Sequence, residues 1–354
     1  MIDYLKSPAK NEIEVTVFGP GYGESIAVHL GGGEWILIDS CIDPYTGESA
    51  SGSYLDSIGV KPDKVRSIVA SHWHDDHVRG ISRLATKYPT ADFVISAVFN
   101  DKEALAFLSA YNGESSSGLA RGAKELFSVI NTRDNVYPAL HKSIILDDKF
   151  NDVSIKVTAF SPVPAAFAQS IAHLAHYLPK NGNSINNAPE IHPNLESIVV
   201  HIDLGDDAIL LGSDLENHNK LGWTAIIDDN WSGKRVPATA YKVAHHGSYT
   251  GDTPNIWSKL LSPEPIACLT SYKLAGKYLP TDADKERVKE NTQHAYIASG
   301  ASRKPQMDKG QLKRLKDIAT NITLLDTGFG AIRLRKKFNE KSWSIELFGA
   351  AQRL

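Results

Sequence analysis

The sequence predicts a mixed α/β protein, an αββα sandwich in which two mixed sheets pack face to face and helices cover their outer faces. Three observations support this prediction. Strand patterns alternate with helix patterns twice along the 354 residues, polar motifs follow directly on apolar strands, and no repeat of fixed period occurs. We expect residues 1–354 to form one domain with helical insertions near 101–135 and 163–193.

The first third of the chain predicts an opening β-meander followed by two αβ units. The meander strands cover 13–19, 25–31 and 34–40, which are apolar or alternating and separated by glycine-rich turns. A helix, a turn and a buried strand over 65–71 follow. The second αβ unit has its helix over 80–88 and its strand over 91–98.

Strand patterns resume after the first insertion and continue almost to the end of the chain. A polar helix is expected over 282–292, between two groups of these strands. The expected strands cover 143–146, 153–162, 196–205, 207–214, a segment ending near 244, 265–272, 321–327, 330–337 and 342–348.

Composition excludes several classes of protein. The chain is 42% hydrophobic and 22% charged with a formal net charge of −3, so it is not basic overall and nucleic acid would need a local basic patch. It lacks the apolar core of a signal peptide and any run of about 20 apolar residues, so we expect a cytoplasmic protein without a membrane partner. Cys41 and Cys268 cannot form a disulfide framework or a thiolate zinc cluster.

The densest motif is SHWHDDH at residues 71–77, which follows the predicted strand 65–71. The imidazoles of His72 and His74 can converge on one cation where the backbone turns. Asp76 and His77 then face a second cation. One loop therefore offers ligands for two metal ions.

Later strands end in further candidate ligands. Asp214 follows the apolar run of 207–214, although an aspartate there also suits the N-cap of a following helix. His245 and His246 come directly off a strand, and Gly247 lets the backbone approach a ligand. Asp39 closes the third meander strand, where hydrogen bonds to a ligand histidine or to the metal loop are its expected role.

The order of these motifs, an aspartate at a strand end, then HxHxDH, then aspartate, then histidine, resembles the metallo-β-lactamase superfamily of dinuclear metallohydrolases. The resemblance runs from about Val15 to the strand near 270. Three segments are similar to the hydrolase domain of ComEC-type DNA-uptake proteins and to phosphorylcholine esterases: VTVFGPGYGESIAVHLGGGEWILIDS, NLESIVVHIDLGDDAILLGSDLE and YKVAHHGS.

The resemblance implies a metallo-β-lactamase αββα sandwich and two divalent ions, zinc or manganese. It implies that His72 and His74 bind one ion, that Asp76 and His77 bind the other, and that Asp214 bridges them. Three supporting residues follow from the same likeness: Asp39, Asn194 and Ser197.

Two assignments stay open. The histidine of the third family motif has no clear counterpart, because His192 and Asn194 both lie near its place. Of the histidine pair, we expect His246 to bind metal and His245 to contact the phosphate or to protonate the leaving oxygen, with Asp76 the other catalytic residue. The family's Gly-Asp is Gly-Ser-Asp here, and KYLPTDAD at 277–284 lacks the histidines of the ComEC-type segment.

Three functions are compatible with the sequence. The first is a phosphodiesterase or nuclease that uses a metal-bridging hydroxide, for which basic clusters at 302–316 and 333–341 would bind single-stranded nucleic acid. These clusters also suit a solvated helix face and an exposed edge strand. The second function is hydrolysis of a small ester, lactone or phosphorylated metabolite beneath insertions that act as lids. The third is a non-enzymatic metal-binding module. Oligomeric state is not predicted.

Overall fold

The fold was analysed in a computed structural model of the chain. It describes residues 6–111, 118–150, 152–178, 193–229, 231–274, 276–300 and 328–354, together with a few isolated residues between 301 and 327.

The first sheet lies in the order β17-β16-β1-β2-β3-β4-β5-β6 within the described residues. β1 pairs antiparallel with β16 and β2, and β2 pairs antiparallel with β3, whereas β3 to β6 run parallel. The strands are β1 (Glu12–Gly19), β2 (Ser25–His29), β3 (Trp35–Ile38), β4 (Val65–Ala70), β5 (Asp92–Ser96), β6 (Val136–Ala139), β16 (Gly330–Lys337) and β17 (Ser344–Gly349).

The second sheet has the order β18-β15-β12-β11-β10-β9-β8-β7 in the same described part. β10, β11, β12 and β15 run parallel, and β7 to β10 form an antiparallel run. Its strands are β7 (Ile144–Phe150), β8 (Val153–Ala159), β9 (Val200–Asp203), β10 (Ala208–Leu211), β11 (Ala238–Lys242), β12 (Leu261–Leu269), β15 (Ala295–Ile297) and β18 (Gln352–Arg353). A separate hairpin pairs β13 (Tyr272–Leu274) with β14 (Lys277–Leu279).

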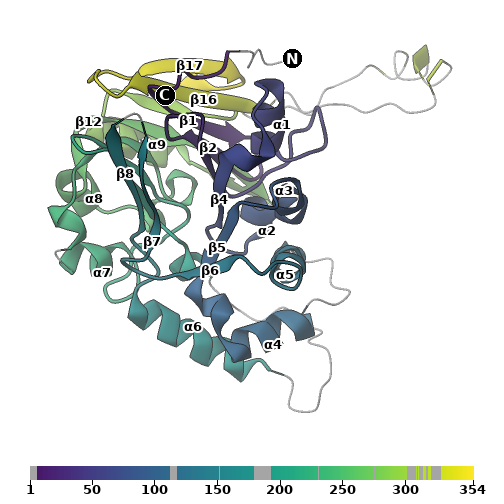
Figure 1. Cartoon of the computed structure of the whole chain (residues 1–354). Coiled ribbons are helices and arrows are strands. Elements are labelled where there is room, and N and C mark those ends of the chain that lie inside the picture. Colours follow the sequence, from purple (N-terminus) through teal and green to yellow (C-terminus); the bar gives the residue numbers. More distant parts are fainter. Residues whose placement is uncertain are drawn as a thin grey trace.

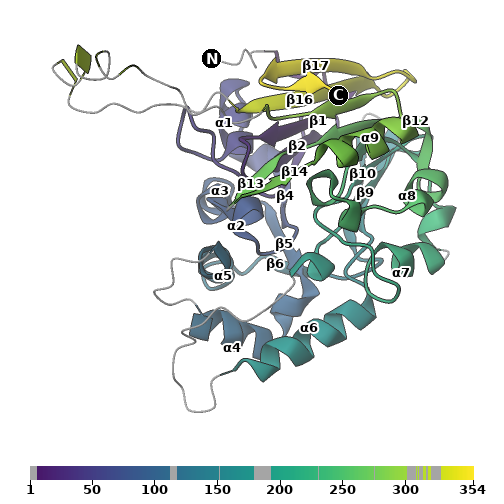
Figure 2. The ribbon, with the colours of Figure 1, turned by 180° about the vertical axis from the view of Figure 1, so that it is seen from behind.

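Helices cover the outer faces of both sheets. Figures 1 and 2 show α1, α2, α3 and α5 beside the first sheet, α7, α8 and α9 beside the second, and α4 next to α6 at one end of the molecule. The helices are α1 (Ala50–Ser57), α2 (Asp75–Val78), α3 (Ile81–Lys87), α4 (Lys102–Tyr111), α5 (Gly118–Ile130), α6 (Pro164–His176), α7 (Trp223–Asp228), α8 (Pro254–Lys259) and α9 (Asp282–Asn291). The predicted αββα sandwich is therefore confirmed.

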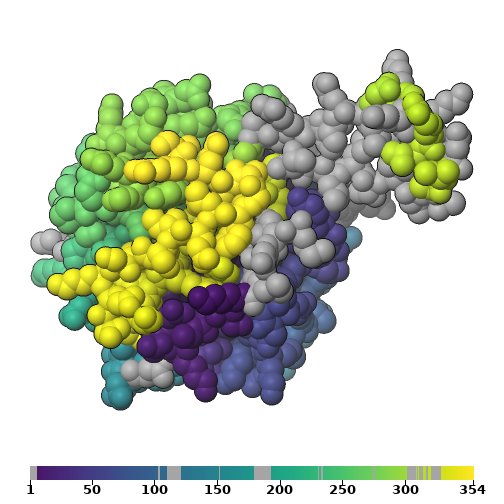
Figure 3. All heavy atoms as spheres, turned by 90° about the horizontal axis from the view of Figure 1, so that it is seen from above, coloured from purple at the N-terminus to yellow at the C-terminus, as the bar shows by residue number. Residues whose placement is uncertain are grey.

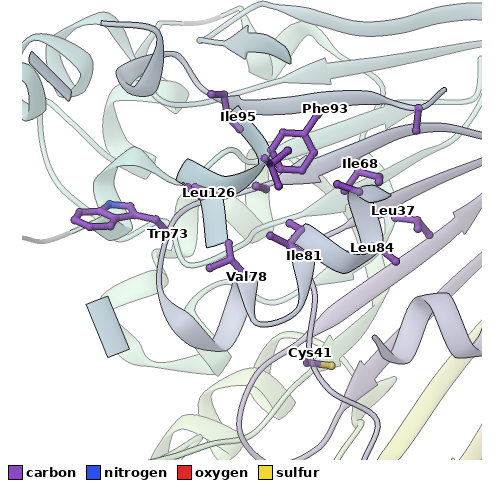
Figure 4. Close-up of a cluster of buried hydrophobic side chains, with 14 of the residues drawn as sticks. Leu37, Cys41, Ile68, Trp73, Val78, Ile81, Leu84, Phe93, Ile95 and Leu126 are labelled. Carbon is purple, nitrogen blue, oxygen red and sulfur yellow. The ribbon is translucent and has the colours of Figure 1, made fainter. Parts of the chain in front are cut away.

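The central strands explain this layering because both of their faces are apolar. Successive side chains of a strand point to opposite faces. Leu37, Ile68 and Phe93 belong to a buried cluster with side chains of the covering helices, which Figure 4 shows in close-up. Ile36 and Val69, their neighbours along the strands, pack in a second cluster that also holds side chains of the other sheet. Each central strand therefore needs a helix layer on one side and a sheet on the other.

The two predicted insertions contain helices. α4 and α5 lie within 101–135, and α6 lies within 163–193, whereas 112–117 and 179–192 fall outside the described residues. α5 packs directly against the metal loop: a Cβ atom added to Gly122 would stand 1.9 Å from the carbonyl oxygen of Trp73. In the part of the chain that the structure describes, no helix has the length and apolar character needed to cross a membrane.

The basic cluster at 333–341 does not form the surface expected from the sequence. β16 is an interior strand between β1 and β17, not an edge strand, and Figure 3 shows the C-terminal strands lying beside the N-terminal residues. Arg333, Arg335 and Lys336 are buried and pair with Glu346, Glu14 and Asp207, respectively. These cations are neutralised inside the fold, so they cannot line a path for nucleic acid. The cluster at 302–316 lies almost entirely outside the described residues.

Candidate metal centre

Loops at one edge of the two sheets carry the polar residues selected from the sequence. His72 and His74 lie between β4 and α2, Asp214 follows β10, and His246 follows β11. The carboxyl ends of parallel strands meet at the same edge of a sheet, which is where α/β proteins build ligand sites. The apolar strands therefore bring residues far apart in sequence to one place.

The backbone of these loops adopts a conformation that most residues avoid. Asp39, Ser213, His245 and His246 have φ angles of 59°, 47°, 47° and 51°. Left-handed conformations of non-glycine residues are uncommon and gather at functional sites, where the surrounding structure maintains them. The strain falls on residues that the sequence had singled out or on their direct neighbours.

A first group of ligand atoms comes from His72, His74 and Asp214, whose nitrogen and oxygen atoms lie within 4.8 Å of one another. His72 Nε2 and His74 Nδ1 are 3.0 Å apart. Two imidazole nitrogens at this distance need a proton or a cation between them, because their lone pairs repel. This group is suited to one metal ion.

A second group comprises Glu24, His77, Asp214 and His246, all of them buried. Asp214 belongs to both groups. Asp76 also adjoins the second group, because its Oδ2 atom lies 3.1 Å from His246 Nε2 and 3.7 Å from His77 Nε2. The structure thus places two potential cation sites side by side, with the Asp214 carboxylate common to both.

Asp39 orients two of the histidines from behind. Its Oδ2 atom lies 2.7 Å from His77 Nδ1 and accepts a hydrogen bond from the Ser71 hydroxyl at 2.7 Å. Ser71 Oγ is in turn 3.1 Å from His72 Nδ1 and must accept there, because its own proton is donated to Asp39. Both rings therefore carry hydrogen on Nδ1 and direct Nε2 into the site, the tautomer that a metal ligand needs.

Unpartnered atoms show that the site fits cations. His77 Nε2 and Asp214 Oδ1 are 3.2 Å apart and buried, and neither has a hydrogen-bond partner among the described residues. Buried polar atoms are otherwise almost always hydrogen-bonded. A metal ion would bind both atoms and remove the cost of burying them.

The surroundings of Asp214 and His72 favour the protonation states that these two ligands need. Although burial opposes ionisation, the imidazoles of His246 and His77 hold the pKa of Asp214 well below its usual range. Burial lowers the pKa of His72 well below that of a free histidine. Asp214 is therefore an anion and His72 is neutral at pH 7, as metal binding requires.

The remaining candidates lie around this centre or outside the described part. His245 keeps a side-chain exposure of 18%, and its Nδ1 atom is 2.8 Å from Thr250 Oγ1. Asn194 Nδ2 is 3.4 Å from His245 Nε2, while its buried Oδ1 atom has no described partner. Ser197 is buried, and its carbonyl accepts a hydrogen bond from Ser161. His192 lies outside the described residues.

Two expectations about single residues can be compared with the structure. Asp214 does not cap a helix, since the next helix, α7, begins at Trp223 with Gly222 as its N-cap. Cys41 is buried in the apolar cluster of Figure 4, and burial raises the pKa of its thiol well above the usual value. Cys41 is thus a core side chain and not a ligand in either group.

Sequence reasoning missed Glu24, Lys242 and Thr270. Glu24 stands in GYGES, where the ComEC-type pattern has aspartate, and Lys242 opens KVAHHGS, so both lay inside quoted motifs. All three are buried beside the histidines. For Glu24 and Lys242 the motif positions were the available signal, but nothing in the sequence showed that these segments meet each other and Thr270.

Comparison with protein families finds a match for the first part of the chain. The family model described as the metallo-beta-lactamase superfamily matches residues 18–136, which include Asp39 and the SHWHDDH loop. No curated protein matches the chain.

Similar solved structures include three proteins that are described as metallo-beta-lactamases or as having the metallo-beta-lactamase fold. MEM-A1, a subclass B3 metallo-beta-lactamase from a soil metagenome library, is 13% identical, with 70% of this chain and 83% of that chain covered and a TM-score of 0.36. The metallo-beta-lactamase fold protein YhfI from Bacillus subtilis is 11% identical, with 81% and 95% covered and a TM-score of 0.40. Metallo-beta-lactamase SMB-1 bound to 2-mercaptoethanesulfonate is 12% identical, with 69% and 82% covered and a TM-score of 0.36. The family match is therefore to residues 18–136, about a third of this chain, and it shows a similarity to the metallo-beta-lactamase superfamily over that part.

Proposed function

We propose that the chain is a metal-dependent hydrolase of phosphoesters, a phosphodiesterase or nuclease that holds two divalent ions. The position of Asp214 carries this proposal, because its carboxylate belongs to both groups of ligand atoms. Two neighbouring ions are the arrangement used by many phosphatases and nucleases. We also propose the cytoplasm as the compartment, since both cysteines are free thiols.

The donor atoms support zinc or manganese. Imidazole and carboxylate make up both groups within the described residues, and cysteine occurs in neither. Such donors accept zinc, manganese or iron. When bound, the ions supply a Lewis acid for a phosphoryl oxygen and lower the pKa of water.

The protein's own residues divide into holding and proton-transfer roles. His72 and His74 hold one ion, Asp76, His77 and His246 hold the other, and Asp214 is shared. His245 is the partly exposed histidine beside the centre, so it can deliver a proton to the leaving oxygen of a substrate. Its hydrogen bond with Thr250 fixes the ring while leaving Nε2 toward Asn194.

The motif pattern favours phosphoesters over carboxyl esters. NLES, GSD and KVAHHGS occur in the order found in ComEC-type hydrolase domains and phosphorylcholine esterases. Single-stranded nucleic acid is the polymeric substrate that this likeness suggests. Its binding surface would not include Arg333, Arg335 or Lys336, which are buried and paired.

A substrate panel tests the proposal. Protein loaded with zinc or manganese should hydrolyse bis(p-nitrophenyl) phosphate, and cleavage of a labelled single-stranded oligonucleotide would extend the activity to nucleic acid. Hydrolysis of p-nitrophenyl acetate or a lactone alone would replace the proposal by the small-ester function. Full metal occupancy with no turnover of any substrate would indicate a binding module.

Two variants serve as controls for contaminating enzymes in the substrate panel. His72→Ala removes a ligand and should abolish turnover together with binding of one ion. His294→Ala removes an exposed histidine directly before β15, whose hydrogen bonds to the described residues use only its backbone, and should leave turnover unchanged.

A further inference from the structure

Glu24 lies in the turn between β1 and β2, directly behind the metal loop. Its backbone N–H donates to the carbonyl of Asp76 at 3.0 Å. Gly23 has a φ of 100°, and a Cβ atom added there would stand 2.6 Å from the same carbonyl. The turn can approach the metal loop this closely because glycine occupies that position. Glu24 is thereby fixed at the interface between the two sheets.

Lys242, the last residue of β11, neutralises Glu24. Its side chain is fully buried and forms an ion pair with Glu24 Oε2. The ammonium is also 3.4 Å from the carbonyl of Ser213, the residue before Asp214. A buried carboxylate stays ionised only when such a partner compensates it. The pair therefore joins a turn of the first sheet to strand ends of the second.

Thr270 connects this ion pair to His246. Its hydroxyl donates to Glu24 Oε2 at 2.7 Å, because a carboxylate can only accept. The hydroxyl oxygen of Thr270, Oγ1, also lies 3.0 Å from His246 Nδ1. Since the hydroxyl proton is already donated to Glu24, Thr270 must accept at this second contact. His246 therefore carries hydrogen on Nδ1.

Glu24 stands behind the histidine rings and not in front of them. Its carboxylate oxygens are 3.8 Å from His77 Nδ1 and 3.7 Å from His246 Nδ1. The Nε2 atoms of both rings face Asp76 and Asp214 instead. Although its oxygen is close enough to be grouped with the ligand atoms, its partners are the rear nitrogens.

We propose that Glu24 is a positioning residue, paired with Lys242, which acts through Thr270 to fix the tautomer of His246 and so directs the His246 Nε2 lone pair to the metal. Asp39 performs the same task for His77 and His72 from the first sheet. The two halves of the site thus have matching supports. This inference concerns metal holding and does not depend on which ester is cleaved.

Thr270→Val is the mildest test, because it keeps the shape of the side chain and removes the acceptor. Two-bond proton–nitrogen NMR spectra of metal-free protein at about pH 8 should show a His246 Nδ1 proton in the parent. In the variant the Nδ1 proton should be lost, while Nε2 keeps the proton that Asp76 accepts at 3.1 Å. Zinc affinity measured by chelator competition should fall by about 10- to 100-fold.

Two further variants serve as controls for this substitution. Thr270→Ser restores a hydroxyl and should return both the tautomer and the affinity. Thr292→Val removes another buried hydroxyl, which lies at the end of α9 and donates to the carbonyl of Pro265. This variant should change neither the His246 tautomer nor the zinc affinity. Unchanged Nδ1 protonation and zinc affinity in folded Thr270→Val would overturn the proposal.

A double variant separates positioning from mere charge compensation. Glu24→Leu combined with Lys242→Met leaves no unpaired buried charge, yet Thr270 loses the acceptor that orients it. Its hydroxyl should then donate to His246 Nδ1, so that Nδ1 no longer carries a proton, and zinc binding should weaken as in Thr270→Val. If this folded double variant keeps the parent tautomer and affinity, Glu24 serves only as the counter-ion of Lys242 and the proposal is wrong.

Discussion

Two buried carboxylates lie at opposite ends of β1, Glu14 inside the strand and Glu24 beyond it, and they have different partners. Glu14, near the start of the strand, accepts hydrogen bonds from Thr16 at 2.7 Å, Tyr54 at 2.6 Å and Arg335 at 2.7 Å. Glu24, beyond the end of the strand, contacts Lys242 and Thr270 behind the histidines. Among these bonds, the ion pair of Glu14 with Arg335 contacts only residues of the first sheet and Tyr54 of α1. The ion pair of Glu24 with Lys242 is connected through Thr270 to His246, a candidate metal ligand. Similar ion pairs thus stabilise a sheet at one end and orient a site at the other.

The largest expected effect comes from removing a candidate metal ligand near Glu24 while leaving Glu14 and its partners unchanged. Asp214→Asn should lose affinity for both ions and lower turnover by more than about 10³-fold, which exceeds the loss of a single transition-state hydrogen bond. The free energy of unfolding of the metal-free protein should also fall at pH 7, because the lowered pKa of Asp214 means that the imidazoles of His246 and His77 stabilise its ionised form in the fold. Metal analysis and urea unfolding check both results. Retention of two ions would show that the Asp214 carboxylate is not shared.

A substitution in the ion pair of Glu14 with Arg335 should change the free energy of unfolding but not the zinc affinity. Arg335→Met leaves the Glu14 carboxylate buried without its cation and should lower the free energy of unfolding by about 3–5 kcal/mol. Zinc affinity of the folded variant should equal that of the parent. Adding Glu14→Gln should recover part of the loss, since no unpaired charge then remains. If zinc affinity in Arg335→Met fell as much as in Thr270→Val, the ion pairs of Glu14 and Glu24 would not differ in function.

A smaller, pH-dependent effect is expected next to Glu14. His29 pairs with Glu14 across β1 and β2, and burial lowers its pKa from 6.5 to about 4. Between these pH values the unfolded chain binds a proton that the folded chain excludes. Stability should therefore fall by about 3 kcal/mol as pH drops through this window and level off below it.

Urea unfolding at several pH values between these limits measures the effect. His29→Gln can still accept the hydrogen bond from Gly33 that His29 Nε2 accepts at 3.0 Å. The variant should show a shallower dependence on pH than the parent. Identical slopes would mean that other groups cause the acid sensitivity.

The sequence predicted the sandwich, and it also selected several residues that the structure brings together, because those signals are local. SHWHDDH shows its ligand spacing within one loop, and Asp214 and His246 each follow an apolar strand. Glu24 and Lys242 could not be paired, since their contact depends on how the two sheets meet. The burial of Arg335 was missed for the same reason, because Glu14 comes from the other end of the chain.

The close contact at Gly122 sets a limit on engineering this fold. α5 touches the backbone of Trp73, between the two ligand histidines of the loop, and even a methyl group on position 122 would collide with it. A chimera that exchanged residues 101–135 for the corresponding segment of another protein would displace His72 and His74 unless it kept glycine there. α5 therefore limits where the backbone of the metal loop can lie, and it cannot be exchanged for a helix without glycine at this position.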